Sequence, residues 1–359
     1  MKIIDKYILR QFLGTFFFSV LLFSAITVVI DVSEKIDDFI EKKAPFKEIV
    51  LDYYLNFVPH IVSLLSPLFI FIAVIFFTSR LSNRSEIIAM TNGGISFYRI
   101  LFGPYLLGAT LLFSLQTIAT NYYVPNANKK RIAFELKYFN KSVNNSDKNI
   151  HFKIDSTTYV YVNSFNSRDN SGIKFGMEKL NGLTLTYKLI ADRVVYNDST
   201  QKWTLYNWFE RHIDGLDETI ASGKTRDTLL RLLPNDFQKK TIYKDAMTTP
   251  ELNAFIAEEQ MRGGKSIETF QVEKYRRMAI PFATFILTAM GYAIASRKVR
   301  GGIGLPLFYG IALSSLFIIS LQFSTTFSIN ANLPPWLGAW IPNIIFGIIT
   351  IYLIIRSQK

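Results

Sequence analysis

Five long stretches of this chain contain no Asp, Glu, Lys or Arg, and they limit its fold more than any other feature. Four of them cover 12–30, 57–79, 100–128 and 278–296, and the fifth covers 301–355. A helix crosses the hydrocarbon core of a bilayer with about 20 apolar residues. The fifth stretch is long enough for two crossings, and the turn-forming sequence at 330–335, Asn-Ala-Asn-Leu-Pro-Pro, divides it. The pattern predicts six membrane-spanning helices, near 12–30, 57–78, 100–121, 277–296, 303–325 and 336–355.

The composition agrees with an α-helical membrane protein. Hydrophobic residues make up 49% and aromatic residues 15% of the 359 residues, more than a soluble domain of this size usually contains. The first stretch is expected to stay in the mature protein, because its apolar part is too long for a cleaved signal and no small-residue cleavage pattern follows at 31–34.

The distribution of Lys and Arg predicts the orientation, because cytoplasmic loops carry an excess of these residues. The short loops at 31–56 and 326–335 together hold four lysines against seven acidic residues. If the N-terminus is cytoplasmic, the inside segments hold only Asp5 and Glu86 as acids. They then hold these basic residues: Lys2, Lys6, Arg10, Arg80, Arg84, Arg99, Arg297, Lys298, Arg300, Arg356 and Lys359. We therefore expect both termini in the cytoplasm and the large central loop in the periplasm.

The central loop changes from a helical to an alternating pattern. Short segments rich in β-branched and aromatic residues, such as 158–162 and 203–209, are separated by Asn, Asp, Gly and Ser. This pattern is typical of antiparallel strands in a sandwich or a roll. Their apolar face can form an ordinary core or an acyl-chain groove, and the composition favours the core. We predict the domains as follows: helices one to three in 1–128, an inserted all-β jellyroll-like domain in 129–248, a connecting helix in 249–276, and helices four to six in 277–359.

The connecting helix has a clear start and an expected end. Thr249, Pro250 and Glu251 provide a capping hydroxyl, a proline in the first turn and a favourable acid. Gly263 and Gly264 are expected to end it near Arg262. The sequence Gly-Gly-Lys-Ser at 263–266 is similar to the end of a phosphate-binding loop, but the required first glycine falls on Glu259. We therefore predict no nucleotide site.

No other motif predicts a catalytic or metal centre. The chain has no cysteine, and its three histidines, His60, His151 and His212, are too dispersed for a metal cluster. His60 lies in the second predicted span, where a hydrogen-bonded interior histidine is a better interpretation than a proton relay. We expect no cofactor and no enzymatic activity, and since the spans are almost free of ionisable residues, energy for transport is expected to enter from a separate protein.

The segment 83–96, on the predicted cytoplasmic side, is the best candidate for that entry. Ser82 or Asn83 can cap a short helix near 83–93, Glu86 lies in its first turn, and Gly93 and Gly94 can end it. Ile87, Ile88 and Met90 supply its apolar face. A helix this short is marginal alone in water, so it requires either the bilayer surface or a docking groove on a partner.

This segment resembles the coupling-helix motif of the LptF/LptG permeases. The matching residues are Ser-Glu-Ile-Ile-Ala-Met at 85–90 and Gly-Ile-Ser at 94–96. The sequences Ile-Asp-Lys-Tyr-Ile at 4–8 and Leu-Pro-Pro-Trp-Leu-Gly-Ala-Trp-Ile-Pro at 333–342 are also similar to the family pattern. The resemblance covers the whole chain and is closer to LptG than to LptF.

The resemblance implies a permease subunit that exports lipopolysaccharide from the inner membrane of a Gram-negative bacterium. Two paralogous permeases would pair on a dimeric cytoplasmic ATPase of the ABC type, and ATP binding and hydrolysis would close and reopen the cavity between them. Lipopolysaccharide would enter beside the first and fifth spans and pass through the jellyrolls to a periplasmic bridge protein.

The resemblance also implies roles for particular residues. Glu86 is the acid expected to meet a basic residue of the ATPase, and Arg84, Ile87, Met90 and Gly94 belong to the same contact. Lys35 lies where LptG-like members carry basic residues near the lipid A phosphates, with Lys42 and Lys43 as weaker candidates. The acids around them, Asp31, Glu34, Asp37 and Asp38, depart from a plainly basic rim.

Two other functions are compatible with a membrane anchor and an outer β-domain. One is a periplasmic scaffold, and the other is a mechanotransmitting ABC permease that transports no lipid. A scaffold needs only one or two spans, and mechanotransmitting permeases carry their outer domain after the first span, whereas here three spans precede it. The layout favours the exporter.

Overall fold

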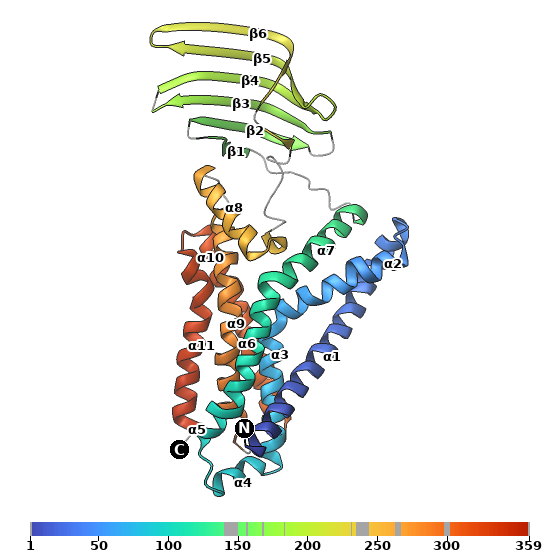
Figure 1. The fold of residues 1–359 in the computed structure, drawn as a ribbon, viewed down its shortest axis with the longest axis vertical. Coiled ribbons are helices and arrows are strands. Elements are labelled where there is room, and N and C mark those ends of the chain that lie inside the picture. The colour runs from blue at the N-terminus through green and yellow to red at the C-terminus, as the bar shows by residue number, and fades with distance from the viewer. Residues whose placement is uncertain are drawn as a thin grey trace. The chain divides into compact units, whose positions relative to one another are not determined.

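The computed structural model describes residues 2–139, 150–155, 157–166, 169–182, 184–230, 232–234, 244–262, 267–297 and 302–357. The chain forms two compact units. The first comprises Met1–Tyr138, Asp245–Thr249 and Gln271–Lys359, and the second comprises Phe139–Lys244 and Pro250–Phe270. Long helices build the first unit, and a β-sheet builds most of the second (Figure 1).

Six helices among the described residues are long and apolar enough to cross a membrane. The first is α1 (Ile3–Glu41). The second, Phe46–Asn83, contains α2 (Phe46–Glu48), the π-helical turn η1 (Ile49–Tyr54) and α3 (Leu55–Asn83). The third, Phe97–Tyr138, contains α5 (Phe97–Ile100), η2 (Leu101–Tyr105), α6 (Leu106–Ile118), η3 (Ala119–Tyr123) and α7 (Val124–Tyr138). The last three are α9 (Ile267–Ala295), α10 (Gly304–Asn330) and α11 (Pro335–Ser357). The prediction of six spans, three before and three after the β-domain, is confirmed.

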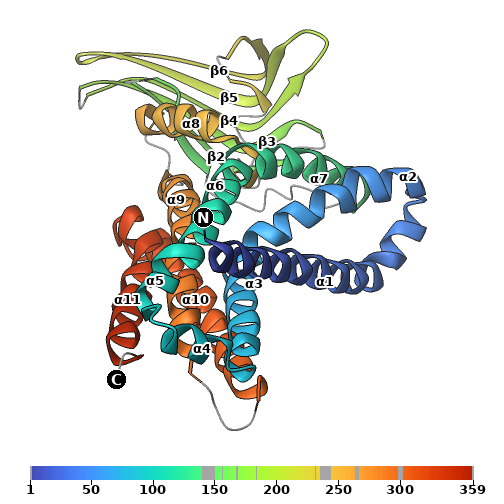
Figure 2. The ribbon, with the colours of Figure 1, turned by 60° about the horizontal axis from the view of Figure 1, so that its bottom comes forward.

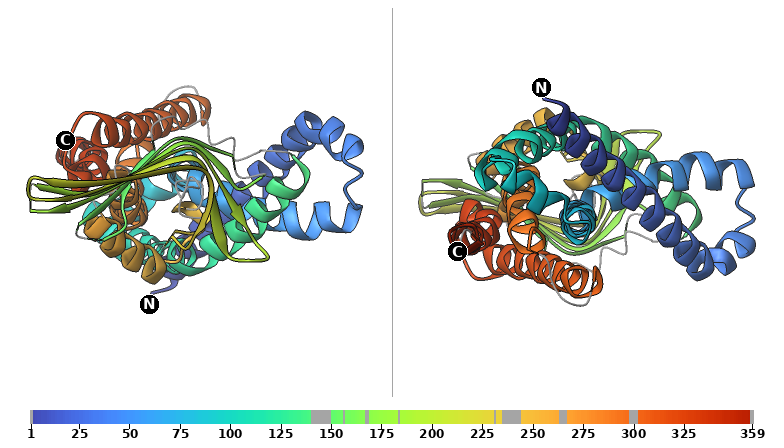
Figure 3. Two further views of the ribbon diagram at one scale, coloured as in Figure 1. Left: turned by 90° about the horizontal axis from the view of Figure 1, so that it is seen from above. Right: turned by 90° about the horizontal axis from the view of Figure 1, so that it is seen from below.

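The helices of the first unit differ in how much of their apolar surface they bury. Each helix contains an apolar window of 18 residues. The buried share of that window is 61% in the second helix and 67% in α9, against 17% in α1 and 22% in α10. The second helix and α9 are therefore central, while α1 and α10 lie at the edges of the unit (Figures 1 and 3). The outward apolar side chains of α1 and α10 must contact lipid or a partner, because exposing apolar surface to water is unfavourable.

The second unit contains one antiparallel sheet whose six strands pair in sequence order. The strands are β1 (Ile150–Lys153), β2 (Thr158–Asn166), β3 (Ser171–Asn181), β4 (Thr184–Asn197), β5 (Lys202–Asp214) and β6 (Asp217–Thr228). The predicted inserted all-β domain is confirmed. The strand pattern allowed a sandwich or a roll. The described residues form a single curved sheet.

A row of backbone irregularities bends this sheet. The pairing of β3 with β4 and of β4 with β5 skips Lys174, Asp192 and Asn207, which occupy neighbouring places on the three strands. Lys174 has φ 53° and Asn207 has φ 50°, both left-handed. The Asn207 amide donates to the Asp192 carboxylate at 3.0 Å. A left-handed residue turns a strand out of its extended path, and such positions aligned across strands bend the sheet (Figure 3).

One face of the sheet is a filled apolar core. Val162, Ala191, Val194 and Leu205 have no exposed surface, and the Trp203 indole donates to the backbone oxygen of Leu232 at 2.9 Å. The bond satisfies the one polar group of a buried tryptophan. The burial agrees with an ordinary core.

The connecting helix α8 (Thr249–Arg262) begins where the sequence predicted. The Thr249 hydroxyl donates to the side chain of Asn121 in η3. The predicted end at Gly263 and Gly264, and the sequence 263–266 that is similar to a phosphate-binding loop, lie outside the described residues.

Candidate functional site

The segment between α3 and α5 forms a short helix, α4 (Glu86–Asn92), that links the ends of the second and third membrane helices (Figure 2). Its N-cap is Ser85, which has a left-handed backbone with φ 60° and makes no side-chain capping bond. The predicted cap at Ser82 or Asn83 was wrong, because α3 continues to Asn83. The buried Ser82 hydroxyl instead donates to the backbone oxygen of Ser296 at 3.1 Å.

The glycine end of α4 is confirmed. Gly94 has φ +84°, a conformation that costs little only for a residue without Cβ. The N–H of Ile95 donates to the oxygen of Met90, and the N–H of Gly94 donates to that of Thr91, both at 3.1 Å. These two bonds form a Schellman motif, which satisfies the last carbonyls of a helix.

The apolar face predicted for α4 is divided between the bundle and the surface. Ile87 is 5% exposed and belongs to the main apolar core, and Met90 packs against that core. Ile88, by contrast, is 42% exposed. Packing on the bundle thus holds α4 in place, and the outer side of the helix stays open.

Glu86 connects α4 to α1. The Tyr7 hydroxyl donates to Glu86 Oε2 at 3.0 Å, and Arg84 Nη1 lies 3.9 Å from Glu86 Oε1. Arg84 and Glu86 keep 56% and 29% of their side-chain surface exposed. The carboxylate is therefore held by its own chain while part of it still faces outward.

A second polar contact joins the base of α1 to the same region. Arg99 in α5 donates to Asp5 Oδ2 at 2.8 Å, and Asp5 also accepts the backbone N–H of Lys2 at 3.1 Å. Asp5 is the more enclosed partner, with 13% of its side chain exposed against 42% for Arg99. The segment from α4 to α5 thus contacts the first turns of α1 at two ionic groups, Asp5 and Glu86.

Sequence reasoning did not predict a role for Tyr7, Asp5 or Arg99 in this site. Tyr7 and Glu86 are 79 residues apart, and Asp5 and Arg99 are 94 residues apart. The available signal was that Asp5 and Glu86 are the only acids on the predicted cytoplasmic side, where basic residues surround them.

The three lysines proposed to meet lipid phosphates differ in their surroundings. Lys35 forms an ion pair with Asp31 at 2.5 Å and donates to the Tyr53 hydroxyl. Lys42 pairs with Glu41 at 2.7 Å. Lys43 follows the end of α1 with φ 51° and is exposed. Two of the three are engaged by acids of their own chain, and Lys43 is exposed.

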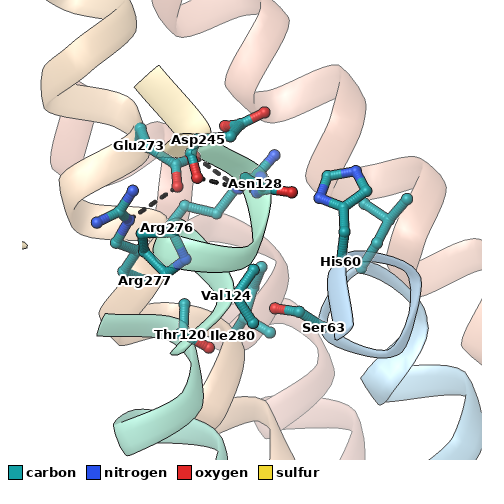
Figure 4. Close-up of a pocket in the computed structure, with 12 residues that line it drawn as sticks. His60, Ser63, Thr120, Val124, Asn128, Asp245, Glu273, Arg276, Arg277 and Ile280 are labelled. Carbon is teal, nitrogen blue, oxygen red and sulfur yellow. Dashed lines mark hydrogen bonds and ion pairs between the residues drawn. The ribbon is translucent and has the colours of Figure 1, made fainter. Parts of the chain in front are cut away.

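A polar cluster occupies the other end of the helix unit, around a cavity of about 40 Å³ (Figure 4). Glu273 in α9 contacts Arg277 at 3.0 Å and Arg276 at 3.2 Å. Arg277 also donates to the backbone oxygen of Met247 at 2.7 Å, and Asn128 donates to that of Asp245 at 2.9 Å. The cluster anchors Asp245–Thr249, where the chain returns to the helices.

His60 also lines this cavity (Figure 4). No group of three His, Cys, Asp or Glu residues among the described parts of the chain is placed to hold a metal ion. The geometry therefore describes two anchoring regions at opposite ends of a helix bundle, one of which carries the partly exposed α4.

The comparison with known protein families accounts for the whole architecture. The family described as "Lipopolysaccharide export system permease LptF/LptG" matches residues 6–356. No curated protein matches the chain. The family match includes all six membrane helices, α4 and the inserted sheet. This chain belongs to the LptF/LptG family of lipopolysaccharide export permeases.

Proposed function

We propose that this inner-membrane permease is driven by a dimeric cytoplasmic ABC ATPase that docks on α4, and that it pairs with a paralogous permease. Together they extract lipopolysaccharide and pass it to a periplasmic bridge protein. Family membership supports the permease role. The excess of Lys and Arg at the α4 end supports a cytoplasmic location for that end and for both termini.

The observation that carries the coupling proposal is the double contact of the α4 to α5 segment with α1. Tyr7 bonds to Glu86, and Asp5 bonds to Arg99. Hydrogen bonds to charged groups each contribute about 1–3 kcal/mol, and less where water reaches them. Two of them bias a two-state movement of α1 by about tenfold or more. A force on α4 is thereby transmitted to the base of α1.

The position of α1 suits a moving element. Only 17% of its most apolar window is buried, the smallest value among the six helices. Most side chains of this window lie outside the core, while Ile8, Phe12 and Phe16 fix the base of the helix in it. The fifth membrane helix, α10, is the next least buried at 22%. Exposed apolar surface on both helices supports the proposal that lipid enters beside them, against the paralogous permease.

For the lipid phosphates we rank the three lysines by their availability. Lys43 is exposed, whereas Lys42 must release Glu41 and Lys35 must release Asp31 before either meets a phosphate. Separating the partly enclosed Lys35–Asp31 pair is unfavourable, whereas separating the more exposed Lys42–Glu41 pair costs little. We therefore propose Lys43 as the first contact, with Lys35 shaping the wall of the site through Asp31 and Tyr53.

The experiment that tests coupling uses the chain purified with its native partners and reconstituted in proteoliposomes. Lipopolysaccharide release per ATP hydrolysed is measured for Glu86→Gln and Glu86→Arg. We expect release to fall about threefold for the neutral variant and tenfold or more for the reversed charge. The matched control is Asp217→Asn in the second unit, which also removes one acid.

Two results would overturn the proposal. One is a native preparation that contains no ABC ATPase, and the other is a Glu86→Arg permease that releases lipopolysaccharide at the rate of the unchanged protein. A loss of ATPase binding with retained folding would support docking at α4.

A further inference from the structure

A groove of about 510 Å³ lies between α1 and α3, beside the base of α1. Arg10, Gln11, Gly14 and Phe18 line it from α1, and Phe76 and Arg80 line it from α3. None of these residues has a role in the coupling contacts described above. Tyr7, which bonds to Glu86, lies at the edge of the same groove.

On both helices the arginine lies nearer to α4 than the phenylalanine does. On α1, Arg10 lies two turns before Phe18, which corresponds to about 12 Å along the helix axis. On α3, which runs the opposite way and ends near α4, Phe76 lies one turn before Arg80. The groove is therefore cationic at the α4 end and apolar toward the middle of the helices.

The cationic end is open to an anion. Arg10 and Arg80 are both exposed, and neither pairs with a carboxylate in the described part of the chain. Glu86, which Tyr7 connects to the edge of the groove, is held by Tyr7 and Arg84. A guanidinium presents N–H groups in a fork that matches phosphate oxygens. Two such groups on facing helices provide the charge and the donors for one phosphate.

The apolar end has room for a hydrocarbon chain. Phe18 and Phe76 are 65% and 38% exposed. Between Arg10 and Phe18 the helix carries Gly14, and a Cβ built on Gly14 meets nothing within 4 Å. The glycine leaves a channel between the charged end and the two rings.

We propose that this groove binds an anionic glycerophospholipid of the leaflet on the α4 side. Its phosphate contacts Arg10 and Arg80, and an acyl chain lies along Gly14 against Phe18 and Phe76. Charge complementarity selects an anionic headgroup, because basic pockets between membrane helices attract such lipids. A bound lipid would bridge α1 and α3 next to Tyr7, and so would hold the base of α1 in its contact with α4.

The test measures lipid binding to the purified full-length chain in detergent, by native mass spectrometry and by the rise in thermal unfolding temperature. The probes are phosphatidylglycerol, phosphatidylcholine and inorganic phosphate. We expect phosphatidylglycerol to bind about tenfold more tightly than phosphatidylcholine. The double variant Arg10→Gln with Arg80→Gln is expected to lose this preference. No ATPase is present, so the result is independent of the coupling proposal.

Two further variants separate a site from general charge. Lys6→Gln with Arg356→Gln removes the same charge from the same end of the unit outside the groove, and we expect it to bind phosphatidylglycerol as the unchanged chain does. Gly14→Leu fills the channel and keeps both arginines, and we expect it to weaken lipid binding while inorganic phosphate binding stays the same. Because Gly14→Leu leaves every charge in place, a loss of lipid binding in this variant would come from the channel and not from charge.

Three outcomes would overturn the proposal. The first is equal phosphatidylglycerol binding by the unchanged chain and the Arg10 and Arg80 double variant. The second is an equal loss in the Lys6 and Arg356 control, which would make binding a matter of net charge. The third is inorganic phosphate that binds as tightly as the lipid, which would make the groove a site for free anions.

Discussion

The hydroxyl of Tyr7 donates a hydrogen bond to the carboxylate of Glu86 at 3.0 Å and joins the first turns of α1 to the start of α4. Tyr7 belongs to the helix with the smallest buried share, and Glu86 belongs to the segment expected to receive the ATPase. One hydrogen bond thus lies between the point where energy is proposed to enter and the helix proposed to move.

Tyr7→Phe removes only this bond. We expect lipopolysaccharide release per ATP to fall about fivefold, because a partly exposed bond to a carboxylate contributes about 1 kcal/mol. Thermal stability should change little. The control is Tyr98→Phe, since Tyr98 is 38% exposed and lies on α5 in the same segment. Equal release by both variants would remove the Tyr7 contact from the coupling route.

Asp5 and Arg99 should show a measurable coupling free energy in a double-mutant cycle. Asp5→Asn and Arg99→Gln, alone and together, are expected to give about 1 kcal/mol of coupling, because Asp5 is enclosed while Arg99 is partly screened by water. The comparison pair is Asp169 with Arg193, whose side chains are 47% and 52% exposed. We expect its coupling to be close to zero in the same thermal unfolding assay.

A cycle in which Asp5 and Arg99 couple no more strongly than the exposed pair would show that this contact does not hold α1. Lipopolysaccharide release per ATP would then be expected to stay unchanged in both variants.

Gly108 allows α6 to approach α1. A Cβ at this position would overlap the ring of Phe12, which is fully buried and stacks on Phe77 at 5.4 Å between ring centroids. Gly108→Ala should destabilise the helix unit by about 1–3 kcal/mol, because the ring has no space to move. The measurement is the thermal unfolding of the full chain in detergent.

The matched control is Gly347→Ala in α11, where the nearest atom to the added Cβ is 3.9 Å away. We expect this variant to be as stable as the unchanged chain or slightly more stable, since alanine favours a helix. If Gly108→Ala left the thermal stability unchanged, the Phe12 ring and α1 would be able to shift without cost.

Glu273 is the counterion of two arginines in the polar cluster. Its side chain is 7% exposed, and that of Arg277 is 3% exposed. Glu273→Gln should cost about 3–5 kcal/mol, because it leaves buried positive charge without a partner. The double variant Glu273→Gln with Arg277→Met should be less destabilised than the sum of the single variants.

The same unfolding assay checks this prediction, with Glu178→Gln as the control for loss of one acid. Glu178 pairs with Lys188 on the sheet, and their side chains are 42% and 35% exposed, so only a small effect is expected. Additive losses at Glu273 and Arg277 would show that the two groups act independently.

The membrane helices and the glycine end of α4 could be predicted because their causes are local. The bilayer requires about 20 apolar residues for each crossing whatever the rest of the chain does, so the turn at 330–335 was enough to separate α10 from α11. Gly94 was recognisable because only a residue without Cβ takes its backbone conformation easily. The strands followed from alternation along single segments.

The partners of the charged side chains had to come from the tertiary structure. Lys35 and Asp31 are an exception, since their spacing of four residues already places them on one helix face. Ser82 could not be separated from a helix cap by its sequence context, because its acceptor is the backbone oxygen of Ser296, which directly follows α9. The bend of the sheet depends on irregularities that align across three strands, and register between strands is not written in any one of them.

Sequence by itself determined the six spans, the inserted strands and the glycine end of the short helix α4, since length, polarity and periodicity act within a segment. Tertiary structure alone decided that Glu86 bonds to Tyr7 and that Arg10 faces a groove shared with Arg80. The physical reason is range: a helix or strand forms from neighbours in sequence, whereas a hydrogen bond or a groove forms wherever packing brings distant side chains together.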